Sequence, residues 1–195
     1  MYAEINNGKI MKKVHPGGSY KNISFGTNAT RDEYIQAGLY ELIEITPEIS
    51  EYEIHGNSVI TLDNTTKTAT VTKEVLEVSI DFAKKRNTEK INMACESAIV
   101  GGFPSSALGA EHTYQSERED QLNLVGVVSS GVDQLFKCSA DAGNTWEWKL
   151  HTAAQLKQVL KDGAAVKSAL LQTAQSKKAS ISTAQSVAEV ASIIW

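Results

Sequence analysis

Residues 91–103 read INMACESAIVGGF, residues 112–126 read HTYQSEREDQLNLVG, and residues 144–151 read NTWEWKLH. These pieces belong to one stretch, 87–151, around which the rest of the chain is organised. The first piece predicts a helix with apolar residues at helical spacing, which ends at Gly101-Gly102 with Pro104 just beyond. A short strand-like piece, a second helix and two tryptophans follow. The residue types indicate a compact packing unit without a visible catalytic constellation.

Three capping boxes predict where helices start in the second half of the chain. The pairs are Ser116 with Glu119, Thr152 with Gln155, and Ser186 with Glu189. The middle pair opens the longest helix, whose apolar stripe comprises Leu156, Val159, Leu160, Val166, Leu170, Leu171 and Ala174. The last pair precedes a short helix, VAEVASII.

The clearest β pattern lies at 51–75, EYEIHGNSVITLDNTTKTATVTKEV. Two runs rich in β-branched and aromatic residues flank Asp63-Asn64, and Gly56-Asn57 is a second turn candidate. The segment therefore predicts a small antiparallel meander. From about Leu76 the apolar period becomes helical.

Two further regions complete the secondary-structure prediction. Residues 1–30 are polar with interspersed glycines, which predicts extended structure and turns, and 31–42 predict a short helix that Gly38 weakens. Near the middle of the second half, Trp146, Trp148 and Leu150 alternate on one side, which suggests one half-buried strand.

Together these patterns predict an α+β protein. The N-terminal module, 1–75, is expected to be a small antiparallel β module that docks to a partner. A connecting helix leads into 76–195, which is expected to be mainly helical with a short β element.

Composition limits the classes of function. The chain has 195 residues and a formal net charge of −4. Nucleic-acid binders normally carry a basic stripe, and none occurs here. No segment approaches the roughly 18–20 apolar residues of a transmembrane helix, and the first residues lack the apolar core of a signal peptide. We therefore expect synthesis in a cytoplasm and neither nucleic acid nor membrane as a partner.

The two cysteines, Cys95 and Cys138, do not have the spacing of metal ligands. Cys95 falls on the apolar side of a helix, where a buried thiol that acts as a small hydrophobic side chain is expected. A disulfide between the two cysteines is the less favoured alternative, because a cytoplasm is reducing.

No residue pattern indicates catalysis, a metal or a cofactor. The four histidines are scattered, and no two share one element at metal-ligand spacing. His151 precedes a helix cap, so we expect it to pack or to form a hydrogen bond. Glu117, Glu119 and Asp120 lie in a first helical turn, where the helix dipole favours carboxylates. We therefore expect a protein that is not an enzyme.

The C-terminal segment leaves alternatives open. The long helix is rich in alanine with a narrow apolar stripe, so it either packs on its own domain or pairs with another copy or a partner protein. Trp195 ends the chain, and we expect its indole to dock on the core or in an interface.

The order of motifs in the second half resembles a known domain. The residues are Ile91-Asn92, Ala94-Cys95-Glu96, Gly102-Phe103, Ser105-Ser106-Ala107-Leu108-Gly109, His112-Thr113-Tyr114, Ser116, Asp120-Gln121-Leu122-Asn123-Leu124, Gly126, a Trp before His151-Thr152-Ala153-Ala154-Gln155, and Trp195. This order, over about 88–195, resembles a domain of unknown function found in tailed bacteriophages and prophages. That domain forms the C-terminal half of tail-fibre-associated and baseplate-associated proteins. Residues 1–75 are only loosely similar to the variable N-terminal β modules of such proteins.

The resemblance implies fold-defining or interface residues and no catalytic ones. They are Tyr114, Asp120, Asn123, Trp146, Trp148, His151 and Trp195. Asp120 and Asn123 are expected to form local hydrogen bonds, and the aromatic residues are expected in the core.

The resemblance also implies a function in phage tails. We expect a non-enzymatic structural component of the tail, at the baseplate or the tail-fibre attachment, located in the virion after synthesis in the host bacterial cytoplasm. Its partners would be other tail proteins, with itself as a further option. The alternative is a tail-fibre assembly chaperone, and less favoured hypotheses are a receptor-binding or glycan-hydrolysing tail protein.

Overall fold

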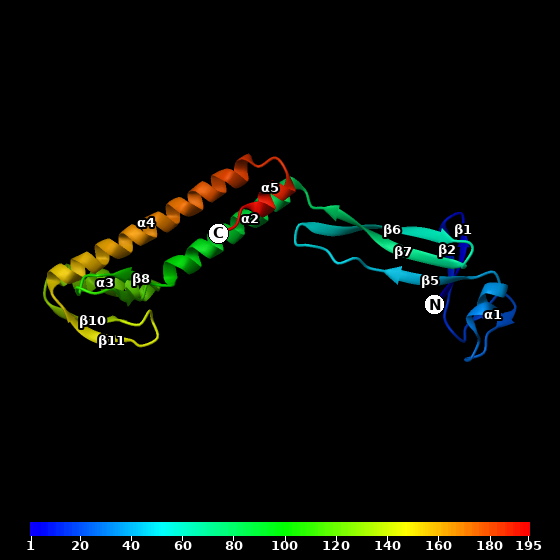
Figure 1. Cartoon of the computed structure of the whole chain (residues 1–195), viewed down its shortest axis with the longest axis horizontal. Coiled ribbons are helices and arrows are strands. Elements are labelled where there is room, and N and C mark those ends of the chain that lie inside the picture. Colours follow the sequence, from blue (N-terminus) through cyan, green and yellow to red (C-terminus); the bar gives the residue numbers. More distant parts are fainter. The chain divides into compact units, whose positions relative to one another are not determined.

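The computed structural model describes all 195 residues and divides them into two compact units, Met1–Val78 and Ser79–Trp195. The first unit is mainly β and the second mainly helical (Figure 1), which confirms the α+β class. The division falls three residues after the predicted module boundary, because the last strand of the first unit continues to Glu77.

A five-stranded sheet forms most of the first unit, in the order β2-β1-β5-β7-β6. The strands are β1 (Tyr2–Asn6), β2 (Lys9–Val14), β5 (Tyr40–Ile45), β6 (Glu53–Asp63) and β7 (Thr68–Glu77). Neighbours are antiparallel except β5 and β7, which are parallel. The predicted antiparallel β module is thus present, and it includes one parallel pair that the sequence did not indicate. The edge strands are β2, which holds three lysines, and β6.

The meander predicted at 51–75 is the β6–β7 hairpin. Its turn follows Asp63, whose Oδ1 accepts hydrogen bonds from the N–H groups of Thr65 and Thr66 at 2.8 and 3.1 Å. The second turn candidate, Gly56-Asn57, is not a turn. The register between β6 and β7 shifts between His55 and Ser58, so these residues form a bulge inside β6.

The short helix α1 (Arg31–Gln36) ends six residues before the predicted end. Gly38 adopts a left-handed conformation with φ of +85°, and Tyr40 begins β5. Thr30 and Glu33 cap the start as a capping box. Together with the small β3–β4 hairpin (Ser19–Tyr20 and Ile23–Ser24), α1 surrounds a core that comprises Val14, Tyr20, Phe25, Tyr34 and Leu39.

The second unit joins two long helices to small β elements (Figure 1). Its elements are α2 (Ile80–Val100), β8 (Phe103–Ser105), β9 (His112–Tyr114), α3 (Arg118–Ser130), β10 (Gln134–Cys138), β11 (Glu147–His151), α4 (Ala153–Thr183) and α5 (Val187–Ser192). Helix α2 starts at its cap Ser79, later than expected, because Leu76 still pairs with Ile54 in β6. It ends at Gly101, as predicted.

The helix caps agree with the sequence in two of three cases. Thr152 and Gln155 form the predicted capping box of α4, and the Ser186 side chain caps α5. The cap of α3 differs by one residue, because Glu117 with Asp120 forms the capping box in place of Ser116 with Glu119. Ser116 is buried instead.

Helices α2 and α4 pack side by side within the second unit. Their buried residues are Ala83, Asn87, Ile91 and Cys95 on α2 and Leu156, Val159, Ala174 and Ile181 on α4. Cys95 is therefore a buried free thiol, as expected, and α4 packs on its own unit, although Leu171 of its predicted stripe is half exposed. At Gly163 of α4 an added Cβ would lie 2.7 Å from the ring of Phe103, so β8 approaches the helix closely there.

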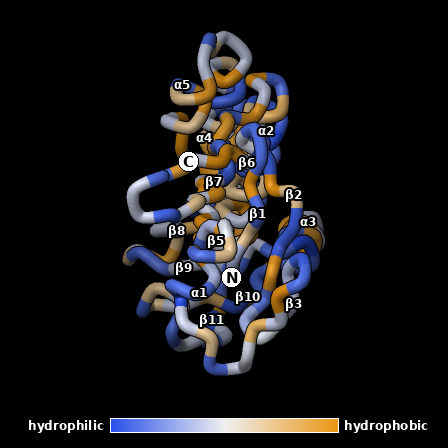
Figure 2. Tube along the Cα trace, turned by 90° about the vertical axis from the view of Figure 1, so that its right-hand side faces the viewer, coloured by the Kyte–Doolittle hydropathy of each residue, from blue (hydrophilic) through white to orange (hydrophobic).

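Figure 2 shows apolar and polar residues alternating along the chain. None of the helices combines the length and the apolar character that crossing a membrane requires.

Candidate functional site

Five of the seven residues singled out from the sequence fall into two groups in the second unit. Tyr114 and His151 are buried. Asp120, Asn123 and Trp148 line one surface groove. The structure thus separates an internal polar centre from an exposed surface, and the two have different chemical capacities.

The internal centre is the hydrogen bond between Tyr114 Oη and His151 Nε2, 2.9 Å long. His151 Nδ1 lies 2.8 Å from the carbonyl oxygen of Lys149, which only accepts, so Nδ1 carries the proton and Nε2 accepts from the Tyr114 hydroxyl. Phe136 contacts the imidazole edge-on. Burial lowers the pKa of His151, although its hydrogen bond to the Lys149 carbonyl opposes the shift, and burial raises the pKa of Tyr114.

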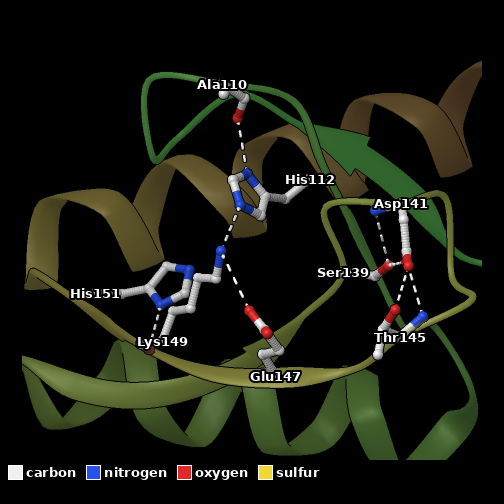
Figure 3. A network of polar contacts seen from close by, with 8 residues as sticks. All are labelled: Ala110, His112, Ser139, Asp141, Thr145, Glu147, Lys149 and His151. Carbon is white, nitrogen blue, oxygen red and sulfur yellow. Dashed lines mark hydrogen bonds and ion pairs between the residues drawn. The ribbon is translucent and has the colours of Figure 1, made fainter.

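A second chain of polar contacts runs from His112 to β11 (Figure 3). His112 Nδ1 lies 2.9 Å from the Ala110 carbonyl oxygen, and its Nε2 lies 3.3 Å from Lys149 Nζ. Lys149 Nζ also lies 3.5 Å from a carboxylate oxygen of Glu147. These contacts tie the loop before β9 to β11, so they account for His112 by structure alone.

Asp141 organises the loop of the β10–β11 hairpin (Figure 3). Its carboxylate accepts hydrogen bonds from the Ser139 hydroxyl at 2.6 Å and from the N–H and hydroxyl groups of Thr145. These bonds, that of Ser139 first, lower the pKa of Asp141 to about 2. The Ser139 hydroxyl thus donates to a carboxylate and not to an imidazole, so this serine lacks the base of a nucleophilic triad.

The remaining chemical candidates are also held in structural roles. Burial raises the pKa of the free thiol of Cys138, which makes it a poor nucleophile. Glu117 and Asp120 cap α3. Nowhere in the structure do three or more His, Cys, Asp or Glu side chains gather into a group that could hold a metal ion.

The exposed surface lies on the outer side of the β10–β11 hairpin. Leu135 pairs with Leu150, and Lys137 pairs with Trp148, so these four side chains share one side of the two strands. Leu135, Leu150 and Trp148 are 58%, 65% and 66% exposed. The hairpin therefore presents an apolar side with a single charge to solvent, which we call the hairpin face.

The placement of Trp148 corrects the sequence prediction. The inner side of the hairpin carries Phe136, Cys138 and His151, which contact the core, so Trp148 and Leu150 point the other way. Trp146 precedes β11 and is half-buried, with Lys137 Nζ 5.8 Å from its ring centroid. The expectation of both tryptophans in the core is wrong for Trp148, because alternation alone does not tell which side of a strand is covered.

A groove of about 700 Å³ separates α3 from the hairpin. Leu122, Asn123 and Gly126 line it from α3, and Leu135 and Trp148 line it from the hairpin. Asn123 is exposed and its amide forms no hydrogen bond within the chain, contrary to the expected local one. The sequence analysis missed Leu122, Leu135 and Leu150 as surface residues, because an apolar residue in a helix or strand is ordinarily assigned to the buried side.

Trp195 is 40% exposed and lies beyond α5. Its indole is therefore partly covered and partly open to solvent, and docking on the core or in an interface stays a prediction. Asn87 of α2 fixes this end of the chain, because its amide donates to the carbonyl oxygens of Val190 and Ile193 at 2.7 and 3.0 Å.

Comparison with known families identifies the second unit. A family described as a domain of unknown function (DUF4376) matches residues 82–194, which is more than half of the chain. No curated protein and no solved structure matches the chain. The matched segment contains the groove, the hairpin face and the Tyr114–His151 pair.

Proposed function

The chain belongs to the DUF4376 family, a domain of unknown function, and from this premise we propose that it is a non-enzymatic structural component of a bacteriophage tail. It acts at the baseplate or the tail-fibre attachment by docking to another tail protein. The resemblance of its motif order to domains of tail-associated proteins supports the phage context. The virion is then its final location, and the host bacterial cytoplasm is its site of synthesis.

The observation that carries the docking role is the hairpin face. Apolar side chains that are more than half exposed and lie next to one another mark protein interaction sites more often than isolated exposed ones do. Trp148 is the central side chain, because it contacts the groove and also lies beside Leu150 and Leu135 on the strands. Tryptophan is the residue type most enriched among side chains that dominate binding energy.

The surroundings of the face indicate the chemistry of its partner. Lys137 is its one charged residue, and Asp120 lies in the groove. A complementary protein surface would offer an apolar centre that covers Trp148, with an acidic group near Lys137. Such an arrangement excludes water from the centre and leaves the charges at the rim.

The test is incorporation of the protein into phage particles. Trp148→Ala removes the central side chain without altering the core, and Met93→Ala on α2 removes a similarly exposed apolar side chain as the matched control. Phage that depend on each variant are grown, and gradient-purified particles are compared with crude lysate by quantitative mass spectrometry. We expect the wild type and Met93→Ala at a fixed ratio to the tail tube. We expect Trp148→Ala in particles at a level reduced by about tenfold or more, as for the loss of a dominant interface side chain.

The same measurement separates a second candidate function, a tail-fibre assembly chaperone. An exposed apolar face also suits transient binding of an unassembled fibre. A chaperone that leaves after assembly would be abundant in the lysate and missing from particles. Equal incorporation of Trp148→Ala and Met93→Ala would contradict docking through the hairpin face.

A further inference from the structure

Strand β6 is an edge strand, and the second half of its length is unprotected. Within its sheet it pairs only with β7, so the N–H and C=O groups on its other side lack strand partners. Folded proteins usually block such edges with Lys, Pro or bulges. The bulge at His55–Ser58 distorts the start of β6 and so discourages pairing there. Residues Ser58–Leu62 read SVITL and contain neither a charge nor a proline.

One side of the sheet next to this edge carries exposed apolar side chains among threonines. Pairing of β5, β7 and β6 places Ile43, Thr70 and Thr61 in one row and Ile45, Thr72 and Val59 in the next, all on the same side. Ile43, Ile45 and Val59 are each more than 40% exposed. A partner that continued the sheet beyond β6 would extend these rows with further side chains.

The exposed area of the chain leaves room for a stable interface. For compact domains of the masses of the two units, counted separately, the expected surface is about 10900 Å². The chain exposes 12168 Å², which is about 1300 Å² more. A standard protein interface buries roughly 800 Å² on each partner, which is less than this excess, although the excess belongs to the chain as a whole and not to β6 alone.

We propose that a second copy of this chain occupies the outer edge of β6, paired antiparallel about a two-fold axis at Ile60. In this register Ile60 faces its own copy, Val59 faces Thr61 of the partner subunit, and Ser58 faces Leu62 of the partner subunit. No like charges are opposed, because Ser58–Leu62 has none. Cross-strand pairs of β-branched residues are favourable, and the two sheets become one continuous sheet.

The register provides a sharp test with a matched control. In the double variant Val59→Lys, Thr61→Lys, each introduced lysine would face a lysine of the other copy. In Val59→Lys, Thr61→Glu, each lysine would face a glutamate. Both variants place two charges on the same exposed side of β6, opposite the neutral Thr72 and Thr70. We therefore expect the two variants to change the stability of the folded monomer by similar amounts.

The full-length chain and both variants are compared by sedimentation velocity over a range of concentrations, with circular dichroism as a check of folding. We expect the wild type and the Lys/Glu variant at twice the 21.1 kDa of one chain. We expect the Lys/Lys variant as a folded monomer, with self-association weakened more than about tenfold by like charges directly opposite. In the dimer, amide hydrogens of Ser58–Leu62 should exchange more slowly than in the Lys/Lys variant.

Two results would overturn the proposal. One is a wild-type chain that stays monomeric at high concentration, or that forms another oligomer. The other is equal behaviour of the Lys/Lys and Lys/Glu variants, because only the proposed register distinguishes them. Neither result bears on docking through the hairpin face, which lies in the other unit.

Discussion

At the scale of single residues, the hydrogen bond between Tyr114 and His151 is buried away from solvent. Its loss should therefore lower the free energy of unfolding. The hydroxyl satisfies one ring nitrogen, and the carbonyl of Lys149 satisfies the other. A buried acceptor left without its donor keeps the full cost of its desolvation.

Tyr114→Phe removes only the hydroxyl and leaves Nε2 of His151 without a donor. We expect the free energy of unfolding of the second unit to fall by about 1–3 kcal/mol. All three tryptophans lie in this unit, so urea unfolding followed by tryptophan fluorescence reports it selectively. Ser129→Ala, which removes an exposed hydroxyl bonded to the Val125 carbonyl, is the control and should change stability by less than about 0.5 kcal/mol. Equal effects of the two substitutions would show that the buried bond has no special weight.

The lowered pKa of His151 predicts a pH dependence of the same unit. Below the unfolded-state pKa of about 6.5 the unfolded chain binds a proton that the folded chain does not, so the free energy of unfolding falls as the pH drops toward the folded pKa. The slope for one proton is at most about 1.4 kcal/mol per pH unit. Urea midpoints by tryptophan fluorescence at pH 7.5, 6.0 and 5.0 test this.

An independent check is the NMR titration of the His151 ring, which should take up its proton at a lower pH than an exposed imidazole with its pKa of about 6.5. The carboxylate of Asp141, with a pKa of about 2, loses its contribution only below about pH 4, as the pH falls through its folded pKa. The two groups therefore act in separate pH windows. A midpoint that rises on acidification from pH 7.5 to 5.0 would contradict the neutral, buried histidine.

At the scale of elements, two helical glycines have opposite surroundings. Gly126 lies inside α3, where an added Cβ would meet nothing within 4 Å, whereas at Gly163 of α4 it would meet the ring of Phe103 at 2.7 Å. Glycine inside a helix costs about 0.5–1 kcal/mol relative to alanine. Close packing of β8 explains Gly163, but nothing in the chain itself requires Gly126, which lines the groove.

Gly126→Ala should therefore raise the free energy of unfolding of the second unit by about 0.5–1 kcal/mol, and Gly163→Ala should lower it by about 1–3 kcal/mol through overpacking. Thermal unfolding followed by tryptophan fluorescence compares the two with the wild type. The test is that the two substitutions change the free energy of unfolding in opposite directions. A loss of stability in Gly126→Ala would show that α3 is more tightly packed at this position than the structure indicates.

At the scale of the whole molecule, local sequence signals predicted most helix ends. Features that depend on contacts between residues far apart in the sequence could not be predicted. Gly101 and Thr152 act through bonds within a few residues, so their roles could be predicted. Tyr40 could not be assigned to a strand, because β5 forms by pairing with β1 and, in parallel, with β7.

The candidate site shows the same limit. Trp148 and His151 alternate along one strand, and the sequence pattern is compatible with either side facing inward. Packing of Phe136 and Cys138 against the core turns the His151 side of the hairpin inward, where the Tyr114 hydroxyl, 37 residues before His151, bonds its ring. The hairpin face could therefore be found only once β9, β10 and β11 were placed together.

The two rims of the five-stranded sheet differ in a way that sets the size of any assembly built from it. The rim opposite β6 is β2, in which three of six residues are lysine, and lysine discourages a further strand from adding there. Two chains joined through β6 would thus turn a lysine-bearing strand outward at both ends. No further chain would then add to either end of the joined sheet. A sheet that pairs through one rim only therefore forms a closed dimer and not a fibre.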